Sequence, residues 1–116
     1  MIRLIRLFTG DDGQSHVSEE HVELLPEGRD DASAWQDATA IRFAESPPRS
    51  TLDWHDAPRR QYVITLSGTL EFTTRHGETF RLGPGDVLLA EDTAGGGHTW
   101  RLVDDAPWRR VYVSLG

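Results

Sequence analysis

Hydrophobic and polar positions alternate with a period close to two from about residue 38 to the end of the chain. Val, Ile, Thr and aromatic residues are frequent in these segments, and turn residues separate them, which is typical of antiparallel strands. The pattern predicts an all-β sandwich or barrel. The expected strands cover residues 39–43, 52–55, 62–66, 69–74, 79–82, 87–90, 98–103 and 108–115.

Proline and glycine mark the turns between these strands. Pro47 and Pro48 interrupt the sheet because proline has no N–H to donate to a neighbouring strand. The polar tip at residues 75–78 predicts a hairpin, and the sequence GPGD at residues 83–86 predicts a second tight turn.

The first 37 residues follow a less regular pattern. Residues 2–8 alternate, residues 21–24 are a candidate short strand, and residues 28–34 are typical of a polar connector. Residues 31–36 are the one candidate for a helix. We expect a single domain in which residues 1–37 supply N-terminal strands and a cover, and residues 38–116 form the barrel core.

The segment Tyr-Val-Ile-Thr-Leu at residues 62–66 is apolar on both faces. A strand of this kind is normally covered on both sides. Either the N-terminal strands or a second subunit is expected to cover its outer face, and residues 2–8 are the candidate for both roles. The sequence therefore predicts a homodimer.

Size and charge limit the function. A chain of 116 residues is long enough for one sizeable core and too short for two. Twelve basic residues against nineteen acidic ones give a net charge of -7, which repels phosphate backbones and anionic membrane surfaces. Nucleic acid and membrane are therefore not expected partners. The chain has no cysteine, which excludes disulfides, thiolate nucleophiles and cysteine-ligated metals.

The N-terminus does not have the pattern of a targeting segment. Arg3 and Arg6 interrupt the apolar positions of its first residues, and Asp11 and Asp12 follow closely. No apolar run approaches the roughly 18 residues of a membrane-spanning helix. A cytoplasmic location is expected.

Residues 54–68, WHDAPRRQYVITLSG, carry a motif. His55, Ala57, Gln61 and Gly68 have the spacing of the His, His, Glu and closing Gly in G(x)5HxH(x)3-4E(x)6G. That pattern is the first motif of the cupins, which this chain resembles, although Arg49 replaces the leading Gly. The resemblance covers roughly residues 38–115 and implies an antiparallel jelly-roll β-barrel, also called a double-stranded β-helix.

The second cupin motif, G(x)5PxG(x)2H(x)3N, is matched more loosely. Gly85 matches the opening Gly of this motif and His98 matches its His, but the connection between them is longer than in the motif. Leu102 occupies the position of the Asn. The segments RLFTGDDGQSH, HDAPRRQ and GPGDVLLAEDTAGGGH are also similar to an uncharacterised bacterial cupin subfamily with a degenerate metal motif.

The resemblance implies a site inside the barrel. Cupins commonly hold Fe, Mn, Ni or Zn with three His and one carboxylate. Strand alternation places His55, residue 57 and Gln61 on the inner face, with His98 opposite. Ala57 offers no lone pair and Gln61 is neutral, so His55, Gln61 and His98 form either a weak metal site or a hydrogen-bonded polar cluster without metal.

Additional residues could complete a metal site or bind substrate. The candidates for a further metal ligand are His16, Asp53 and Asp92. Arg59 is the candidate to bind a carboxylate or phosphate, because a guanidinium binds such groups in a bidentate way. Alternatively, Arg59 and its neighbour Arg60 pair with acidic side chains at the surface.

Aromatic and glycine residues near these positions also have more than one interpretation. Trp100 lies two residues from His98 on the same expected strand, so it should share the inner face and narrow the pocket. Trp54 and Trp108 line the cavity, lie at a subunit contact or belong to the core. The triple glycine at residues 95–97 is either a mobile lip at the pocket mouth or a longer connection between strands.

Three functions remain open at this stage. The first is an enzyme, isomerase-like or dioxygenase-like, that acts on a small anionic or carbonyl substrate. His55 and His98 would ligate a metal or transfer protons, and Arg59, Gln61 and Trp100 would contact the substrate. The second is a metal-free module that binds or senses a small molecule. The third is a purely structural protein with a filled core.

Overall fold

The structure is a computed structural model that describes residues 1–116 and contains twelve strands and no helix. Accordingly, no helix long and apolar enough to cross a membrane is present. The strands are β1 (Arg3–Thr9), β2 (Ser15–His21), β3 (Leu25–Glu27), β4 (Asp30–Ala32), β5 (Ala40–Ser46), β6 (Thr51–His55), β7 (Gln61–Ser67), β8 (Leu70–Thr74), β9 (Thr79–Leu82), β10 (Val87–Glu91), β11 (His98–Leu102) and β12 (Trp108–Ser114).

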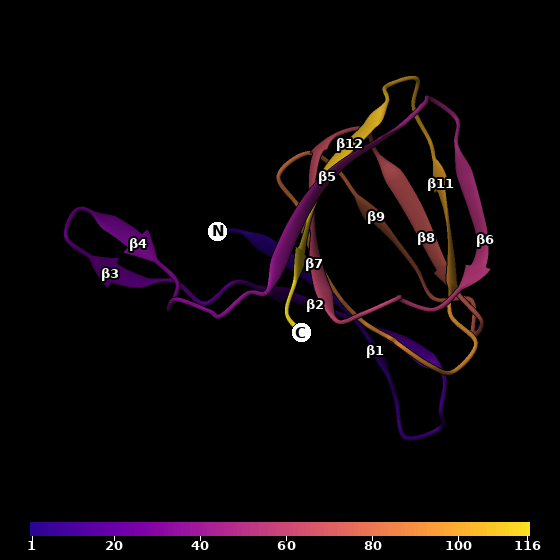
Figure 1. The fold of residues 1–116 in the computed structure, drawn as a ribbon, viewed down its shortest axis with the longest axis horizontal. Coiled ribbons are helices and arrows are strands. Elements are labelled where there is room, and N and C mark those ends of the chain that lie inside the picture. Colours follow the sequence, from indigo (N-terminus) through magenta and orange to yellow (C-terminus); the bar gives the residue numbers. More distant parts are fainter.

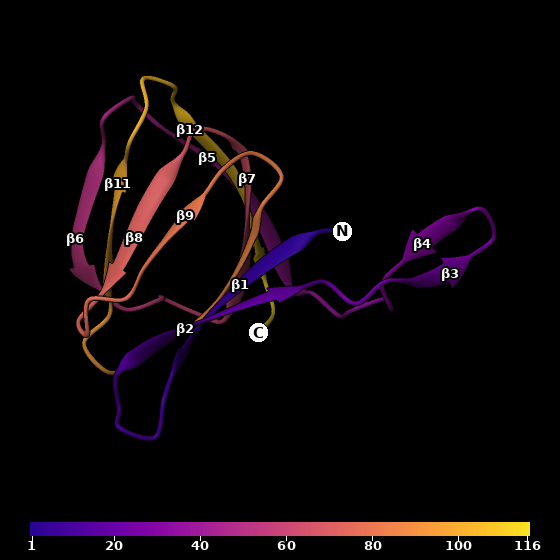
Figure 2. The same cartoon turned by 180° about the vertical axis from the view of Figure 1, so that it is seen from behind.

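Two sheets face each other and curve around a common interior, as the ribbon in Figure 1 and its reverse view in Figure 2 show. One sheet has the order β2-β1-β10-β7-β12-β5 and the other has the order β6-β11-β8-β9. All neighbouring strands are antiparallel except β1 and β10, which are parallel. The all-β jelly-roll architecture predicted from the sequence is confirmed.

Strand alternation decides which side chains reach the interior. In β7 and β8, buried residues alternate with partly exposed ones, as expected for strands with one face on the core. Phe72 and Phe80 stack with ring centroids 4.8 Å apart, and both are nearly fully buried. The aromatic pair and its aliphatic neighbours fill the closed end of the space between the sheets, so the remaining space is left as a pocket.

Two glycine turns have a positive φ, and at one of them a side chain would also meet the neighbouring chain. Gly85 has φ +88° in the turn between β9 and β10, where the Asp86 carboxylate accepts a hydrogen bond from the Gly83 N–H at 2.8 Å. Gly68 has φ +87°, and a β-carbon there would lie 3.0 Å from the Pro107 carbonyl oxygen. Both turns agree with the turn signals in the sequence.

The N-terminal segment differs from the expectation in one important respect. Strand β1 extends the large sheet by pairing in parallel with β10, and Ile5 and Leu7 are fully buried. The prediction that residues 2–8 cover the outer face of residues 62–66 is therefore wrong within this chain, because this segment lies in the same sheet rather than above it.

Residues 22–39 form an arm that extends away from the two sheets in both views (Figures 1 and 2). It ends in the short hairpin of β3 and β4. The expected strand at residues 21–24 and the candidate helix at residues 31–36 are wrong, because strand β2 ends at His21 and β4 is followed by extended chain. The polar connector expected at residues 28–34 includes part of this hairpin.

Candidate functional site

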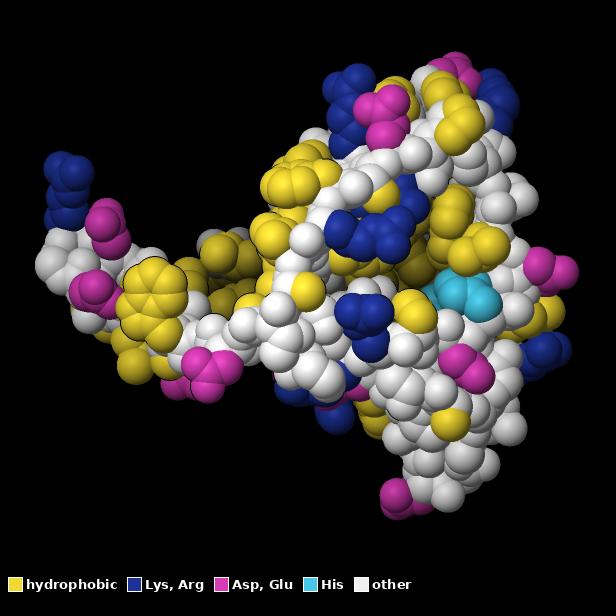
Figure 3. All heavy atoms as spheres, in the orientation of Figure 1, with side chains coloured by type: hydrophobic (Ala, Val, Ile, Leu, Met, Phe, Trp, Pro, Cys, Tyr) yellow, Lys and Arg dark blue, Asp and Glu magenta, His cyan; other side chains and the backbone are white.

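A pocket of about 440 Å³ opens between the two sheets. Strands β5, β7 and β12 form one wall, and β6, β8 and β11 form the other. Figure 3 shows the opening as a hollow floored by hydrophobic side chains, with basic side chains on one side and histidine on the other. The residues of the pocket used below are Arg42, His55, Ala57, Arg59, Gln61, His98, Trp100, Trp108, Arg110 and Tyr112.

His98 is held by a buried hydrogen-bonded chain. Its Nδ1 donates to Asp92 Oδ2 at 2.6 Å, and the Ser15 hydroxyl donates to the same oxygen at 2.7 Å. Asp92 and Ser15 are fully buried. Because the carboxylate accepts the Nδ1 proton, Nε2 is the ring nitrogen that has no hydrogen-bond partner in the protein. His98 lines the pocket, so Nε2 is the atom that a ligand can reach.

His55 lies on the neighbouring strand β6 and also uses Nδ1 for a hydrogen bond within the protein. Its Nδ1 donates to the Asp53 carbonyl oxygen at 2.8 Å, and its ring centroid lies 4.4 Å from that of His98. Burial is the main influence on His55 and lowers the pKa of its imidazole, an effect that the Asp53 carbonyl only partly opposes. Both rings therefore use Nδ1 for a hydrogen bond within the protein and leave Nε2 available in the pocket.

The other two motif positions do not supply metal ligands of the usual kind. Ala57 and Gln61 both line the pocket, as the sequence predicted, but Ala57 presents only a methyl group. The Gln61 amide is neutral and makes no hydrogen bond within the protein. The nearby carboxylate of Asp92 is already committed to Ser15 and His98. These donors do not fit the three-histidine and carboxylate set of a cupin metal centre.

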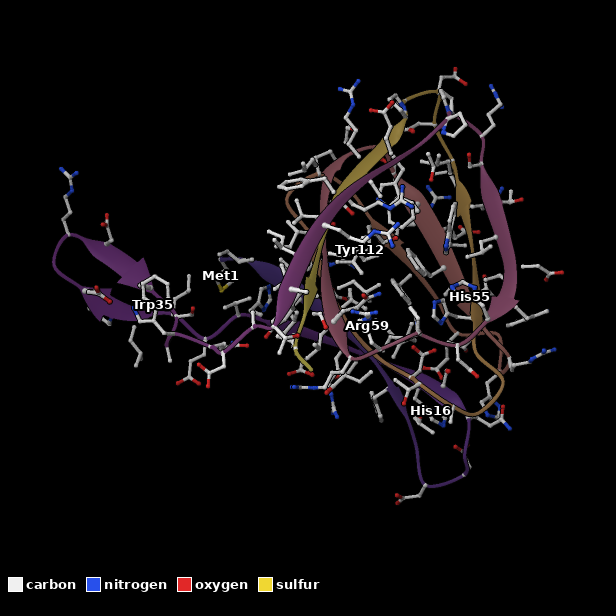
Figure 4. The ribbon with its side chains drawn as sticks, viewed as in Figure 1. Met1, His16, Trp35, His55, Arg59 and Tyr112 are labelled. Carbon is white, nitrogen blue, oxygen red and sulfur yellow. The ribbon has the colours of Figure 1, made fainter.

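Arginines line the pocket from the wall opposite the two histidines. Arg42, Arg59 and Arg110 all line it, and none of them forms an ion pair with a carboxylate. Arg110 lies over the Trp108 ring at 3.9 Å and donates to the Tyr112 hydroxyl at 3.0 Å, which fixes its guanidinium. Figure 4 shows Arg59 and Tyr112 on the side of the barrel opposite His55.

Arg59 and Arg60 are separated by the fold. Arg59 lines the pocket, whereas Arg60 donates to Glu91 Oε2 at 2.6 Å on the other side of the chain. Arg6 binds the second oxygen of Glu91 at 2.7 Å. Burial alone would raise the pKa of the Glu91 carboxyl, but the two arginines outweigh burial and leave that pKa below its ordinary value. Only one of the two adjacent arginines is therefore available to a ligand.

The structure does not bring the other candidate ligands into the pocket. The His16 ring lies within hydrogen-bond distance of Asp12 and Glu78 and is not near His55. The Asp53 side chain accepts a hydrogen bond from the Trp54 N–H and remains exposed.

The tryptophans and the triple glycine also have defined positions. Trp100 and Trp108 line the pocket with ring centroids 4.8 Å apart, whereas Trp54 lies outside it under the Arg75 guanidinium. All three glycines at residues 95–97 have positive φ. A β-carbon on Gly97 would overlap the His55 carbonyl oxygen. Gly97 therefore allows the loop to pack on the backbone of β6 at His55, whereas Gly95 lies against the backbone of Gly13 in the loop between β1 and β2.

Arg42, Arg110 and Tyr112 were not anticipated from the sequence. Arg110 and Tyr112 have the same parity as Trp108 along β12, so alternation could have placed them inside. Arg42 lies on β5, which pairs with β12, and Tyr112 and Arg42 are partners in register. The signal was present, but it depends on knowing which face of β12 is internal.

Two facing sheets with a pocket between them define a barrel of the cupin type. Two solved structures are similar to it. The cupin domain of Cnp3 from Schizosaccharomyces pombe is 14% identical, with a TM-score of 0.55 over 100% of this chain and 86% of that one. A conserved protein of unknown function from Streptococcus pyogenes is 22% identical, with a TM-score of 0.52 over 72% of this chain and 68% of that one.

These likenesses show the fold and carry no information on the reaction. The chain therefore has an all-β, cupin-type fold, which confirms the fold that the resemblance implied. No protein-family model matches the chain. No curated protein sequence matches it either.

Proposed function

We propose that the pocket binds a small anionic organic molecule, such as a carboxylic acid or a sugar phosphate. The observation that carries this proposal is the charge of the pocket. Three arginines and two histidines line it and no Asp or Glu does, although the whole chain has a net charge of -7. Unpaired guanidiniums bind carboxylate and phosphate in a bidentate way, and the apolar walls strengthen that attraction.

The two histidines give the bound ligand a route for proton transfer. An Nε2 lone pair accepts a proton from a carbon next to the ligand's carbonyl or carboxylate group and returns it at a neighbouring atom. Such a step is a proton-transfer isomerisation, in which no atom is gained or lost. Asp92 holds His98 in the required tautomer, and Arg59 and Gln61 orient the anion.

Adjacent arginines provide a matched test of anion binding. A panel of small carboxylates and sugar phosphates is titrated into the protein by isothermal calorimetry. For any ligand that binds, Arg59→Ala is expected to weaken binding at least tenfold, because one bidentate charged contact is lost. Arg60→Ala is the control, since Arg60 is paired with Glu91 outside the pocket. Equal effects of the two variants would contradict the proposal.

Proton exchange tests the catalytic part. A bound ligand in D2O is expected to incorporate deuterium at the carbon that the imidazole deprotonates, and NMR follows that exchange. His98→Gln and His55→Gln should each slow it by about 10²–10⁴-fold, the usual contribution of a general base. Ligand binding without any exchange would favour the second candidate.

The second candidate is a binding or sensing module that performs no chemistry. Ala57 and Gln61 favour it, because both replace donors that a metal-dependent cupin would use. The metal that the resemblance implies at His55, Gln61 and His98 stays a prediction. Elemental analysis of untagged protein tests it: stoichiometric Fe, Mn, Ni or Zn that is lost in His55→Ala and His98→Ala would support a metal-dependent, dioxygenase-like enzyme instead.

We also propose that two copies of the chain associate through the arm. Trp35 on the arm is completely exposed, and the edge strand β5 exposes Ile41 and Phe43. A groove lined by Trp35, Tyr62 and Ile64 runs between the arm and the outer face of the large sheet. A short isolated hairpin is at best marginally stable in water, which argues that a second copy packs against it.

Light scattering coupled to size exclusion tests this association. The full chain is expected to be a dimer, and Trp35→Ser combined with Phe43→Ser a monomer. Trp54→Ser is the control, because Trp54 is less exposed and lies under Arg75. A monomeric wild-type protein would refute the dimer.

The cytoplasmic location stays a prediction that cell fractionation tests.

A further inference from the structure

A second group of metal-ligating side chains lies outside the pocket, where the loop between β1 and β2 meets the hairpin between β8 and β9. It consists of Asp12 in the loop, His16 on β2 and His76 at the tip of the hairpin. One ligand atom from each residue lies within 4.8 Å of the others. Figure 4 shows His16 at the lower end of the molecule, away from His55 and the pocket.

The distances between these atoms match the edges of a metal coordination shell. His16 Nε2 lies 2.9 Å from Asp12 Oδ2, and His76 Nε2 lies 3.4 Å from the same oxygen. Ligands at bond lengths of about 2.1 Å are separated by about 3.0 Å in an octahedral shell and about 3.4 Å in a tetrahedral one. A cation can therefore bind all three groups after small side-chain rotations.

The orientation of His16 is also that of a metal ligand. Its Nδ1 lies 3.1 Å from Glu78 Oε1, so a carboxylate holds the ring from behind and directs Nε2 toward Asp12. Carboxylate–histidine–metal arrangements of this kind are the usual support for metal-bound imidazoles. Both ring nitrogens lie within hydrogen-bond distance of carboxylates, and a divalent cation would occupy the position of a proton on Nε2.

The backbone around His16 leaves room for this arrangement. A β-carbon on Gly10 would lie 2.5 Å from His16 Cδ2, so only glycine lets the ring occupy its position. The rings of His16 and His76 are stacked with centroids 5.2 Å apart. Their side chains are 31% and 47% exposed, and that of Asp12 is 48% exposed, which leaves coordination positions open to water.

We propose that Asp12, His16 and His76 bind a divalent transition-metal ion, with Glu78 as the outer partner of His16. Two imidazoles and one carboxylate favour Zn²⁺, Co²⁺, Ni²⁺ or Cu²⁺ over Ca²⁺ and Mg²⁺. The ion joins the loop at residues 10–14 to the hairpin at residues 75–78, two segments that only their side chains connect. This site is independent of the function proposed for the pocket.

Calorimetric titration of the untagged full chain with ZnCl₂ tests the proposal. One ion is expected per chain. His16→Ala combined with His76→Ala should weaken binding at least 100-fold, and Glu78→Gln should weaken it by about 10–100-fold, as loss of an outer partner usually does. His55→Ala combined with His98→Ala removes the pocket imidazoles and is expected to leave the dissociation constant unchanged.

A second measurement needs no variant. Co²⁺ added to the wild-type protein should broaden the NMR signals of His16 and His76 before those of His55 and His98. The proposal is overturned if zinc does not bind at millimolar concentration or if the His16 and His76 double variant binds as tightly as wild type. It is also overturned if Co²⁺ broadens the pocket histidines first.

Discussion

Removal of the Asp92 carboxylate should destabilise the protein and release His98 at the same time. In Asp92→Ala, the Ser15 hydroxyl and His98 Nδ1 lose their common acceptor in a region from which water is excluded. Each buried donor without a partner costs about 1–3 kcal/mol, so the two losses amount to about 2–6 kcal/mol. Removal of a buried carboxylate whose Oδ1 has no partner offsets part of this cost. We expect a net loss of about 2–4 kcal/mol in the free energy of unfolding.

Asp92→Asn separates the hydrogen bonds from the charge. Both bonds end on the single atom Oδ2, so the amide oxygen of Asn can accept both of them. The amide nitrogen then lies where Oδ1 already has no partner, so one buried unsatisfied group replaces another, and Asp92→Asn should lose less stability than Asp92→Ala. The tautomer of His98 should therefore persist in Asp92→Asn and be lost in Asp92→Ala.

Two assays check this prediction. Urea unfolding measures the change in free energy, and long-range ¹H–¹⁵N NMR spectra show which nitrogen of His98 carries the proton. If Asp92→Ala were as stable as wild type and its His98 kept the Nδ1–H tautomer, the buried chain from Ser15 to His98 would not position the imidazole, and the reasoning would be refuted.

Three further predictions address the loop, the pH dependence and the metal motif. Gly97→Ala should lower the free energy of unfolding by more than about 2 kcal/mol, because Gly97 has a positive φ and a β-carbon there would overlap a carbonyl oxygen. Gly77 also has a positive φ but has open space around it, so Gly77→Ala should cost only about 1 kcal/mol. Urea unfolding measures both values. The pKa of the Glu91 carboxyl is lower in the folded protein than in the unfolded chain, where it is about 4.3. The ionised carboxylate therefore stabilises the fold above about pH 4.3, and this stabilisation is lost as the pH falls through the lower pKa of the folded state. The difference in unfolding free energy between wild type and Glu91→Gln should therefore shrink below about pH 4.3, and a constant difference would contradict this account. The double variant Ala57→His and Gln61→Glu restores the missing metal ligands, so the affinity of the pocket for Zn²⁺ or Ni²⁺ should rise at least tenfold in calorimetry. Unchanged affinity would show that the two positions do not reach a common metal.

Local patterns predicted most of the barrel because strand alternation and glycine or proline turns are properties of short segments. The strands around Phe72 and the turn at Gly85 were found from sequence for this reason. The arm at residues 22–39 was not, since its polar residues have no strong period and its conformation depends on contacts such as the hydrogen bond from the Tyr62 hydroxyl to Gln36. The parallel pairing of β1 with β10 joins residues more than 80 positions apart, which no local pattern reveals.

The sequence by itself determined the fold class, and its motif spacing selected His55, Gln61 and His98, which all line the pocket. The expected alternation along one strand from His55 to Gln61 is wrong as the reason, because β6 ends at His55 and β7 begins at Gln61 in the other sheet. Only the tertiary structure decided what surrounds those residues. It separated Arg59 from Arg60 and placed His16 with Asp12 rather than in the pocket. The physical reason is that burial, hydrogen-bond partners and charge environment arise from chain segments that are distant in sequence and meet only when the two sheets close.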